Sequence, residues 1–233
     1  MKRLAERLLD LLYPPKCAFC RKLVRDSRML CPDCEKNLPY PEKELQVQHF
    51  PHLALCASPL YYTGDVKKSL QRYKFHSAAA YCGIYGELMA VCLKEHAIEA
   101  DLITWVPLSG RRLRKRGYDQ AKLLAEEVAR RTGTEVHRLL IKQVHNRAQS
   151  GAGSPEERAK NVNGVYRCTG NVAEKRILLV DDIVTTGATL SEVAGMLLAA
   201  GAKEVIGLTL ARNEKQEHGH TTDRNGENLN ADF

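Results

Sequence analysis

Short apolar runs alternate with longer amphipathic stretches through the middle of the chain. The apolar runs lie at 54–62, 102–107, 139–141, 177–180 and 203–212, and their length and β-branched residues are typical of buried strands. Apolar residues recur at helical spacing in the stretches 66–73, 78–95, 119–131 and 188–200. This alternation favours an α/β fold, in which a mostly parallel sheet carries helices on both faces.

The two ends of the chain do not follow this pattern. Residues 1–12 are amphipathic at helical spacing and precede closely spaced cysteines, while 213–233 are polar with few apolar groups. Pro39, Pro41 and Pro51 stand among polar residues. We therefore predict four parts: an amphipathic helix and four-cysteine finger at 1–40, a linker at 41–53, the α/β domain at 54–212, and a disordered tail at 213–233.

Composition narrows the class of protein. With 233 residues and 44% hydrophobic content, the chain can bury one α/β core and a small extra domain. No apolar run approaches the length of a membrane span and no secretory signal pattern is found, so we expect a cytoplasmic protein. The first helix is interpreted as an interaction or packing helix, with a membrane-surface helix as the alternative. The net charge of +7 permits nucleic-acid or anionic partners without proving them.

Cysteine spacing indicates a metal site. Cys17 and Cys20 form one C-x2-C pair, Cys31 and Cys34 form another, and ten residues separate the pairs. Two such pairs complete a tetrahedral sulfur site that suits structural Zn²⁺, since four ligands leave no open position. An iron–sulfur cluster and two pairs of free thiols are the alternatives. The finger is basic overall, which is typical either of a binding surface or of a solvated face.

The most informative stretch is Arg-Ile-Leu-Leu-Val-Asp-Asp-Ile-Val-Thr-Thr-Gly-Ala-Thr-Leu at 176–190. A buried strand is expected to end at Asp181 and Asp182, and a tight turn through Gly187 then leads into a helix. Free N–H groups at the helix start and threonine hydroxyls can bind a phosphate, and carboxylates accept hydrogen bonds from sugar hydroxyls. The alternative, a plain strand and polar turn, leaves two adjacent carboxylates without a partner. The candidate ligand-binding residues are Asp181, Asp182, Thr185, Thr186, Gly187, Ala188 and Thr189.

A second candidate anion site follows the strand at 102–107. A Ser-Gly turn after a strand can present consecutive N–H groups to an anion, and here the residues are Leu108, Ser109, Gly110 and Arg111. The basic run that follows can bind pyrophosphate or a nucleic-acid strand, and a solvated charge run is the third interpretation. Its candidate residues are Arg111, Arg112, Arg114, Lys115 and Arg116. Nearby aromatic residues, Tyr73, Phe75 and Tyr118, can stack on bases.

A long polar segment at 142–164 separates the last two strands of the α/β pattern from the strand at 139–141. Loops of this length inside a compact domain are usually functional. Arg147, Gln149 and Arg158 are its most suggestive residues, and an ordinary surface loop is the alternative.

The stretch at 176–190 resembles the ribose-phosphate fingerprint of type I phosphoribosyltransferases. The resemblance implies that Asp181 and Asp182 hold the 2′ and 3′ hydroxyls of phosphoribosyl pyrophosphate (PRPP), and that the loop at 185–189 holds its 5′-phosphate. It also implies that 108–111 receive the pyrophosphate with Mg²⁺, and that 142–164 form the mobile loop that closes over PRPP and excludes water. No nucleobase-binding hood is identified, so the residues do not name an acceptor or a catalytic group.

The complete set of motifs, in this order along the chain, is typical of a narrower family than the type I phosphoribosyltransferases as a whole. It comprises the four-cysteine finger, Val106-Pro107, Arg-Gly-Tyr-Asp-Gln at 116–120, Gln149, Glu157-Arg158 with Asn161-Val162, and the stretch at 176–190. Over about residues 8 to 212 it resembles the ComF competence-protein family, including ComFC and GntX-type members, although that family often has Phe and Asn at 118 and 119.

This resemblance implies a cytoplasmic role in natural transformation. The protein would handle single-stranded DNA beside a helicase-like partner that can bring it to the membrane DNA-uptake machinery. Three hypotheses result: a PRPP-binding protein that engages single-stranded DNA, an active phosphoribosyltransferase with an unidentified acceptor, and a non-catalytic scaffold.

Overall fold

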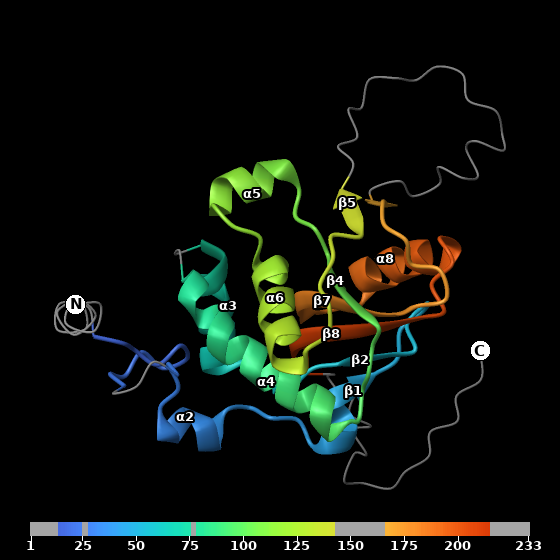
Figure 1. The fold of residues 1–233 in the computed structure, drawn as a ribbon. Helices are drawn as coiled ribbons and strands as arrows, with labels where there is room; N and C mark the ends of the chain where they lie inside the picture. Colours follow the sequence, from blue (N-terminus) through green and yellow to red (C-terminus); the bar gives the residue numbers. More distant parts are fainter. Residues whose placement is uncertain (1–13, 25–27, 76–77, 143–165, 215–233) are drawn as a thin grey trace, which may run out of the picture.

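The computed structural model describes residues 14–24, 28–75, 78–142 and 166–214 (Figure 1). Its first elements, up to the second long helix, are α2 (Pro32–Asn37), η1 (Lys43–Gln46), β1 (Val47–Gln48), β2 (Leu55–Ala57), β3 (Leu60–Tyr61), α3 (Gly64–Phe75), η2 (Ala79–Tyr81) and α4 (Cys82–Glu95). The others are β4 (Leu102–Trp105), α5 (Gly110–Arg116), α6 (Gln120–Thr132), β5 (Leu140–Lys142), β6 (Tyr166–Cys168), β7 (Arg176–Val184), α8 (Ala188–Ala199) and β8 (Glu204–Arg212).

Three expectations fall partly or wholly outside these residues. They are the amphipathic helix at the start of the chain, nearly all of the 142–164 segment, and the tail from residue 215 onward. Among the described helices, none combines the length and apolar character that a membrane crossing requires.

The main sheet has the order β1-β2-β8-β7-β4, and β3 also pairs with β8. The pairs β2–β8, β8–β7 and β7–β4 are parallel, whereas β1 runs antiparallel to β2. Strands β5 and β6 form a separate antiparallel pair. The expected mostly parallel α/β sheet is therefore confirmed.

Both faces of the sheet are buried, as an almost continuous apolar strand requires. Successive side chains of a strand point to opposite faces, so Ile177 and Leu179 belong to one apolar cluster and Leu178 and Val180 to the other. The first cluster includes the buried face of α8, and the second includes those of α3, α4 and α6. Figure 1 shows α8 on one side of the sheet and these three helices on the other.

The segment at 41–53 is more ordered than the linker that its prolines and polar residues predict. It contains η1 and then β1, in which Val47 pairs with Ala57 and Gln48 with Cys56. The Gln46 side chain is buried and its Oε1 lies 3.0 Å from His96 Nε2, at the end of α4. The segment is thus an edge strand and a buried turn of the α/β domain. Its backbone N–H and C=O groups pair with the neighbouring strand, whereas the composition suggested that water would solvate them.

Two predicted strands have different bounds in the structure. The apolar run at 54–62 is divided into β2 and β3, with Ser58 and Pro59 between them. Strand β7 does not end at the two acids but continues through them to Val184, because Asp181 pairs with Thr209 of β8 and Ile183 with Ala211. Asp181 is therefore paired within the sheet and Asp182 lies between two paired residues, so the sheet constrains the backbone of both.

Candidate functional site

A cavity of about 190 Å³ lies where strands β4 and β7 meet their following loops. Val106 and Pro107 come directly after β4, and Asp181 and Asp182 lie near the end of the adjacent parallel strand β7. In open α/β sheets, ligands bind outside the carboxyl ends of the strands. The cavity is thus at the position where the fold favours a ligand, and it contains both acids of the predicted site.

Four cationic side chains line the same cavity as these two acids. They come from three different elements: Lys74 from α3, Arg112 and Arg116 from α5, and Lys142 from β5. The cavity therefore combines two adjacent carboxylates with an excess of positive charge. An anionic ligand that also carries hydroxyl groups matches both features.

The two acids have different environments. Asp182 is only 7% exposed, and its Oδ2 lies 2.8 Å from Lys74 Nζ. Asp181 accepts a hydrogen bond from the backbone N–H of Asp182 at 2.8 Å. Burial, together with the neighbouring carboxylate of Asp182, raises the pKa of Asp181 to about 8, and the hydrogen bond and Lys74 oppose this only partly. Adjacent buried acids do not readily ionise together, and here the raised pKa falls on Asp181.

The turn after β7 has the form that the sequence predicts. Gly187 has φ +76° and is the N-cap of α8, and the backbone N–H of Ala188 donates to Thr186 Oγ1 at 3.4 Å. Thr185 and Thr186 are exposed at the surface, whereas Thr189 lines the cavity with the acids. Only one of the five loop residues at 185–189 thus reaches the cavity wall itself.

The basic run after β4 forms a short helix, α5, rather than an open turn. Ser109 caps it by accepting a hydrogen bond from the Arg112 N–H at 3.4 Å, and the Leu108 N–H donates to Asp119 Oδ2 at 3.1 Å. Leu108, Arg112 and Arg116 line the cavity. Helical periodicity explains this division, because residues four apart share one face.

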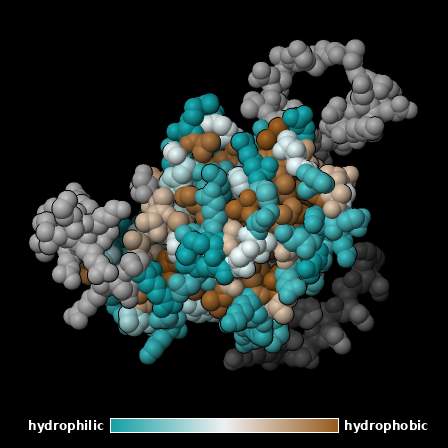
Figure 2. All heavy atoms as spheres, viewed as in Figure 1, coloured by the Kyte–Doolittle hydropathy of each residue, from teal (hydrophilic) through white to brown (hydrophobic). Residues whose placement is uncertain are grey.

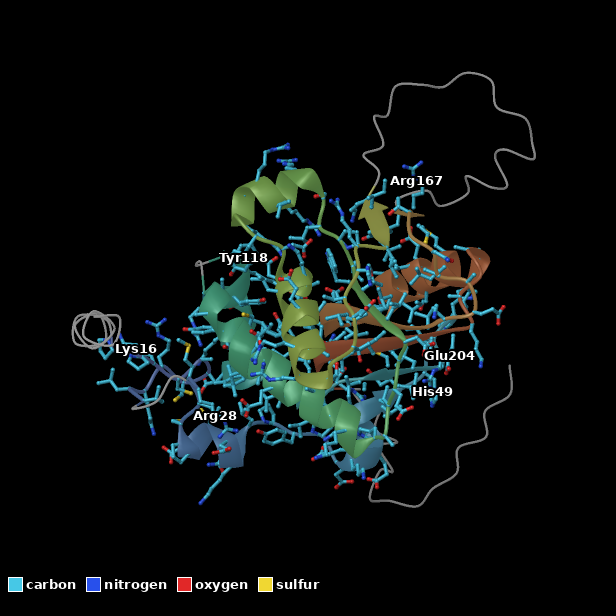
Figure 3. The ribbon with its side chains drawn as sticks, in the orientation of Figure 1. Lys16, Arg28, His49, Tyr118, Arg167 and Glu204 are labelled. Atoms are coloured by element: carbon cyan, nitrogen blue, oxygen red, sulfur yellow. The ribbon has the colours of Figure 1, made fainter. Side chains whose placement is uncertain are left out.

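The other basic residues of α5 do not line the cavity. Arg111, Arg114 and Lys115 are exposed at the surface. Figure 2 shows hydrophilic side chains gathered at the outer tip of α5, and Figure 3 shows side chains ending in nitrogen that point outward there. The run thus has two faces, and the sequence alone did not separate them.

Four polar residues that line the cavity were not among the predicted site residues: Lys74, Gln120, Lys142 and Tyr166. Lys142 Nζ donates to Tyr166 Oη at 2.9 Å and lies 4.6 Å from the centre of that ring. Lys142 is the first residue of the polar segment at 142–164, and Tyr166 lies two residues after its end. Their closeness to this segment is the one feature of the sequence that could have identified them as site residues. The predicted loop residues Arg147, Gln149 and Arg158 lie outside the described part of the chain.

The aromatic residues expected to stack on bases are not equivalent. Tyr73 is completely buried and donates to the Gln120 carbonyl at 3.0 Å, so the prediction that it stacks on bases is wrong. Tyr118 lies between α5 and α3 and donates to the Tyr73 carbonyl (Figure 3). Phe75 is 55% exposed, with the Arg116 guanidinium 5.2 Å from its ring centre. Of these three residues, Phe75 alone presents most of its ring to solvent.

The four cysteines meet as their spacing predicts. The sulfur atoms of Cys17, Cys20, Cys31 and Cys34 all lie within 4.8 Å of one another. Sulfur atoms bound tetrahedrally at about 2.3 Å from Zn²⁺ are about 3.8 Å apart, so this cluster needs little adjustment to hold the ion. Four sulfur ligands complete its coordination. The cluster therefore fits a structural zinc ion.

The zinc cluster is packed against the α/β domain. Arg72 of α3 donates to the backbone carbonyls of Ala18 at 2.8 Å and Phe19 at 2.7 Å, between the first two cysteines. The Phe19 side chain is buried against Tyr85 of α4, with 5.7 Å between ring centres. The finger and the domain therefore share one apolar core.

A larger surface groove of about 640 Å³ lies elsewhere, between α8, β6 and the turn that contains His52. It contains neither acid of the pair, and the cationic residue on its wall is Arg167. The smaller cavity contains the predicted acid pair together with four cationic side chains, so it is the better candidate for the ligand site.

Comparisons with known proteins agree with this geometry. Residues 117–232 match the family profile described as the phosphoribosyl transferase domain, and residues 8–45 match the double zinc ribbon domain. The DNA utilization protein YhgH of Salmonella typhimurium is 29% identical over 193 residues, which are 80% of this chain and 85% of that protein. Competence protein F of Haemophilus influenzae is 26% identical over 81% of each chain, and competence protein ComFC of Streptococcus pneumoniae is 32% identical over 61% of each.

Solved structures give more distant matches. The allosteric regulatory enzyme of purine biosynthesis aligns with a TM-score of 0.41 and 28% identity over 55% of this chain. The glutamine PRPP amidotransferase of B. subtilis aligns with a TM-score of 0.43 and 26% identity over 59%. The aligned parts span 26% and 30% of those two chains. On its sequence motifs, its zinc ribbon and its domain matches, the chain belongs to the ComF/YhgH family of competence and DNA-utilization proteins, with a phosphoribosyltransferase domain behind an amino-terminal double zinc ribbon.

Proposed function

We propose that the cavity binds PRPP together with Mg²⁺. The observation that carries this proposal is that the acid pair and four cationic side chains line the same cavity at the carboxyl ends of β4 and β7. In this arrangement Asp181 and Asp182 accept hydrogen bonds from the ribose hydroxyls. The loop at 185–189 takes the 5′-phosphate through the free N–H groups at the start of α8.

The pyrophosphate end of the ligand is assigned to the opposite wall. Leu108, Arg112 and Arg116 line that wall after β4, and Lys142 completes it. Arginine guanidinium groups bind phosphate oxygens in a bidentate manner, and a bound Mg²⁺ would neutralise part of the remaining negative charge. Ser109, Gly110 and Arg111 contribute by forming the cap and first turn of α5, which orients the two arginines.

A second function, transfer of ribose 5-phosphate to an acceptor, is favoured by one specific observation. The pKa of Asp181 is about 8 because of burial and the adjacent Asp182, and groups that titrate near neutral pH inside a cavity are typical of catalytic sites. Transfer in such a site depends mainly on positioning and on stabilisation of charge by Arg112, Arg116 and Lys142. Pyrophosphate release from PRPP, measured over a panel of acceptors that includes single-stranded DNA, tests this function.

We further propose that the outward face of α5 engages single-stranded DNA. Arg111, Arg114 and Lys115 are exposed there, and exposed Phe75 lies beside Arg116 at the end of α3. Basic residues bind the phosphate backbone and an exposed ring can stack on a base. The names of two relatives refer to DNA utilization and competence, which supports a DNA ligand. A helicase-like partner and a cytoplasmic site of action close to the DNA-uptake machinery stay predictions from the sequence resemblance.

Calorimetric titration with PRPP and Mg²⁺ tests the central proposal. The wild-type protein is expected to bind PRPP, and Asp181→Asn with Asp182→Asn is expected to abolish binding. Arg114→Ala is the matched control, since this residue is exposed and outside the cavity. Equal PRPP affinity in all three proteins would rule out the assignment of the acid pair.

A further inference from the structure

The most unusual contact in the cavity is the ion pair between Lys74 and Asp182. Lys74 Nζ lies 2.8 Å from Asp182 Oδ2, and only 19% of the lysine side chain and 9% of the aspartate side chain are exposed. An ion pair this deeply buried is expensive to desolvate, so its presence at a ligand cavity calls for a functional reason. The lysine is contributed by α3, not by the strands and loops that carry the predicted motifs.

Lys74 is held firmly from two sides. Two residues earlier on α3, Arg72 donates to the Ala18 and Phe19 carbonyls of the first cysteine knuckle. Tyr73 is buried, and its hydroxyl donates to the Gln120 carbonyl at the start of α6. Figure 1 shows α3 lying between the amino-terminal ribbon and α6. The last turn of α3 is therefore fixed by the zinc ribbon on one side and by α6 on the other.

This inference rests on the proposed PRPP site and extends it by one residue. We propose that Lys74 is a positioning residue of the ribose subsite: its ammonium group holds Oδ2 of Asp182 in place and leaves the second carboxylate oxygen to accept a ribose hydroxyl. The ion pair engages Oδ2, and a carboxylate has further acceptor sites on both oxygens. Lys74 also adds positive charge to a cavity that receives a phosphorylated ligand.

The charge balance of the cavity shows why the lysine matters. Burial and Asp182 raise the pKa of Asp181 to about 8 even though Lys74 opposes the rise, so without the ammonium group Asp181 would keep its proton to a higher pH. A protonated acid accepts hydroxyl hydrogen bonds less well than a carboxylate. The charged or titratable groups that face this pair are Lys74, Arg112, Arg116, Asp119, Lys142, Tyr166 and, from β2, Cys56. Of the cations among them, Lys74 has the contact with Asp182.

The test is PRPP affinity, measured by calorimetry with Mg²⁺ at several pH values between 6 and 9. Lys74→Met is expected to weaken binding about tenfold at pH 7, because loss of the ammonium group raises the pH at which Asp181 ionises by about one unit. The ratio of mutant to wild-type dissociation constants should shrink toward pH 9, where the acids ionise without help. Lys74→Arg is expected to restore affinity and the wild-type pH profile.

Lys68→Met is the matched control. Lys68 lies on the same helix, carries the same charge and is exposed beside Asp65, so its loss should leave PRPP affinity unchanged. A purely structural role for Lys74 would weaken binding by the same factor at every pH, and that result would overturn the proposal. Equal affinity of Lys74→Met and wild type would overturn it as well. Absence of PRPP binding by wild type would instead remove the proposed function itself.

Discussion

The ring of Phe50 packs directly against Gly187 at the start of α8. A methyl group added at Gly187 would lie 2.2 Å from Phe50 Cδ1, far inside van der Waals contact. Phe50 belongs to the segment that follows β1, so this edge of the domain closes over the backbone of the proposed phosphate loop. The loop is held in place by packing as well as by its own turn geometry.

Gly187→Ala is therefore expected to lower the free energy of unfolding by more than its left-handed backbone angle alone would. Gly187 has φ +76°, and Gly133 at the end of α6 has φ +75° with nothing within 4 Å of an added methyl group. Gly133→Ala should cost about 1 kcal/mol of unfolding free energy, from the left-handed backbone. Gly187→Ala should cost a further 1–3 kcal/mol, approximately, from overpacking against Phe50. Urea unfolding of both variants measures the difference, and equal losses would contradict the Phe50 contact.

Asp181 should make the stability of the ligand-free protein depend on pH. Its pKa rises from an ordinary 3.8 to about 8 on folding, because of burial and Asp182. The folded state then binds a proton that the unfolded state has lost, so the free energy of unfolding falls as pH rises between these values, by about 1.4 kcal/mol per pH unit. Asp181→Asn removes this dependence and should be more stable than wild type at pH 8.

The same substitution should weaken PRPP binding, because the neutral amide offers one acceptor oxygen where the carboxylate offers two, and places an NH2 donor at the other position. Urea unfolding from pH 5 to 9, with Asp101→Asn at the other end of the sheet as a surface control, separates the two effects. A parallel pH dependence in wild type and Asp181→Asn would show that Asp181 has no raised pKa.

The two faces of α5 should be separable by mutation. Replacing Arg111, Arg114 and Lys115 with Ala is expected to weaken single-stranded DNA binding and to reduce its salt slope by about 2, at about 0.7 for each phosphate that is no longer neutralised. PRPP affinity should stay unchanged, since these residues do not line the cavity. Arg112→Ala with Arg116→Ala should have the larger effect on PRPP. Fluorescence anisotropy measures DNA affinity and calorimetry measures PRPP affinity on the same preparations. If the substitutions at Arg111, Arg114 and Lys115 leave DNA affinity unchanged, the outward face of α5 does not bind DNA.

Removal of zinc should weaken PRPP binding even though the cysteines are remote from the ligand in sequence. Arg72 connects the first cysteine knuckle to the turn of α3 that ends at Lys74, so a loosened knuckle releases Lys74 from Asp182. We expect a loss of about fivefold or more in affinity after chelation, and a smaller loss in the Lys74→Met background. Circular dichroism on the chelated protein checks that the α/β domain remains folded. Equal losses in both backgrounds would contradict a connection through Lys74.

Local sequence patterns predicted the parts of the site that lie within one stretch of chain. Cysteine spacing located the metal site, and the run at 176–190 located the acids, the turn and the helix, because these depend on neighbouring residues. Lys74 could not be found in this way, since its contact with Asp182 spans more than a hundred residues and depends on how α3 packs. The division of the basic run was missed for a different reason: a run of charges does not reveal that α5 is helical until its cap at Ser109 is seen.

Composition was misleading where packing decides the outcome. Tyr73 lies among basic residues in the sequence, yet its ring is buried and its hydroxyl donates a hydrogen bond to the Gln120 carbonyl. Residues 41–53 are rich in proline and polar side chains, yet Val47 and Gln48 extend the sheet and Phe50 covers Gly187. Both outcomes depend on contacts with distant parts of the chain.

The most direct test of the central claim is a crystal structure of the protein with PRPP and Mg²⁺. We expect the ribose hydroxyls to contact Asp181 and Asp182, the 5′-phosphate to lie on the backbone at 185–189, and the pyrophosphate to lie against Arg112 and Arg116. Density for PRPP in the groove between α8 and β6 instead, or the acid pair turned away from a bound ligand, would contradict it.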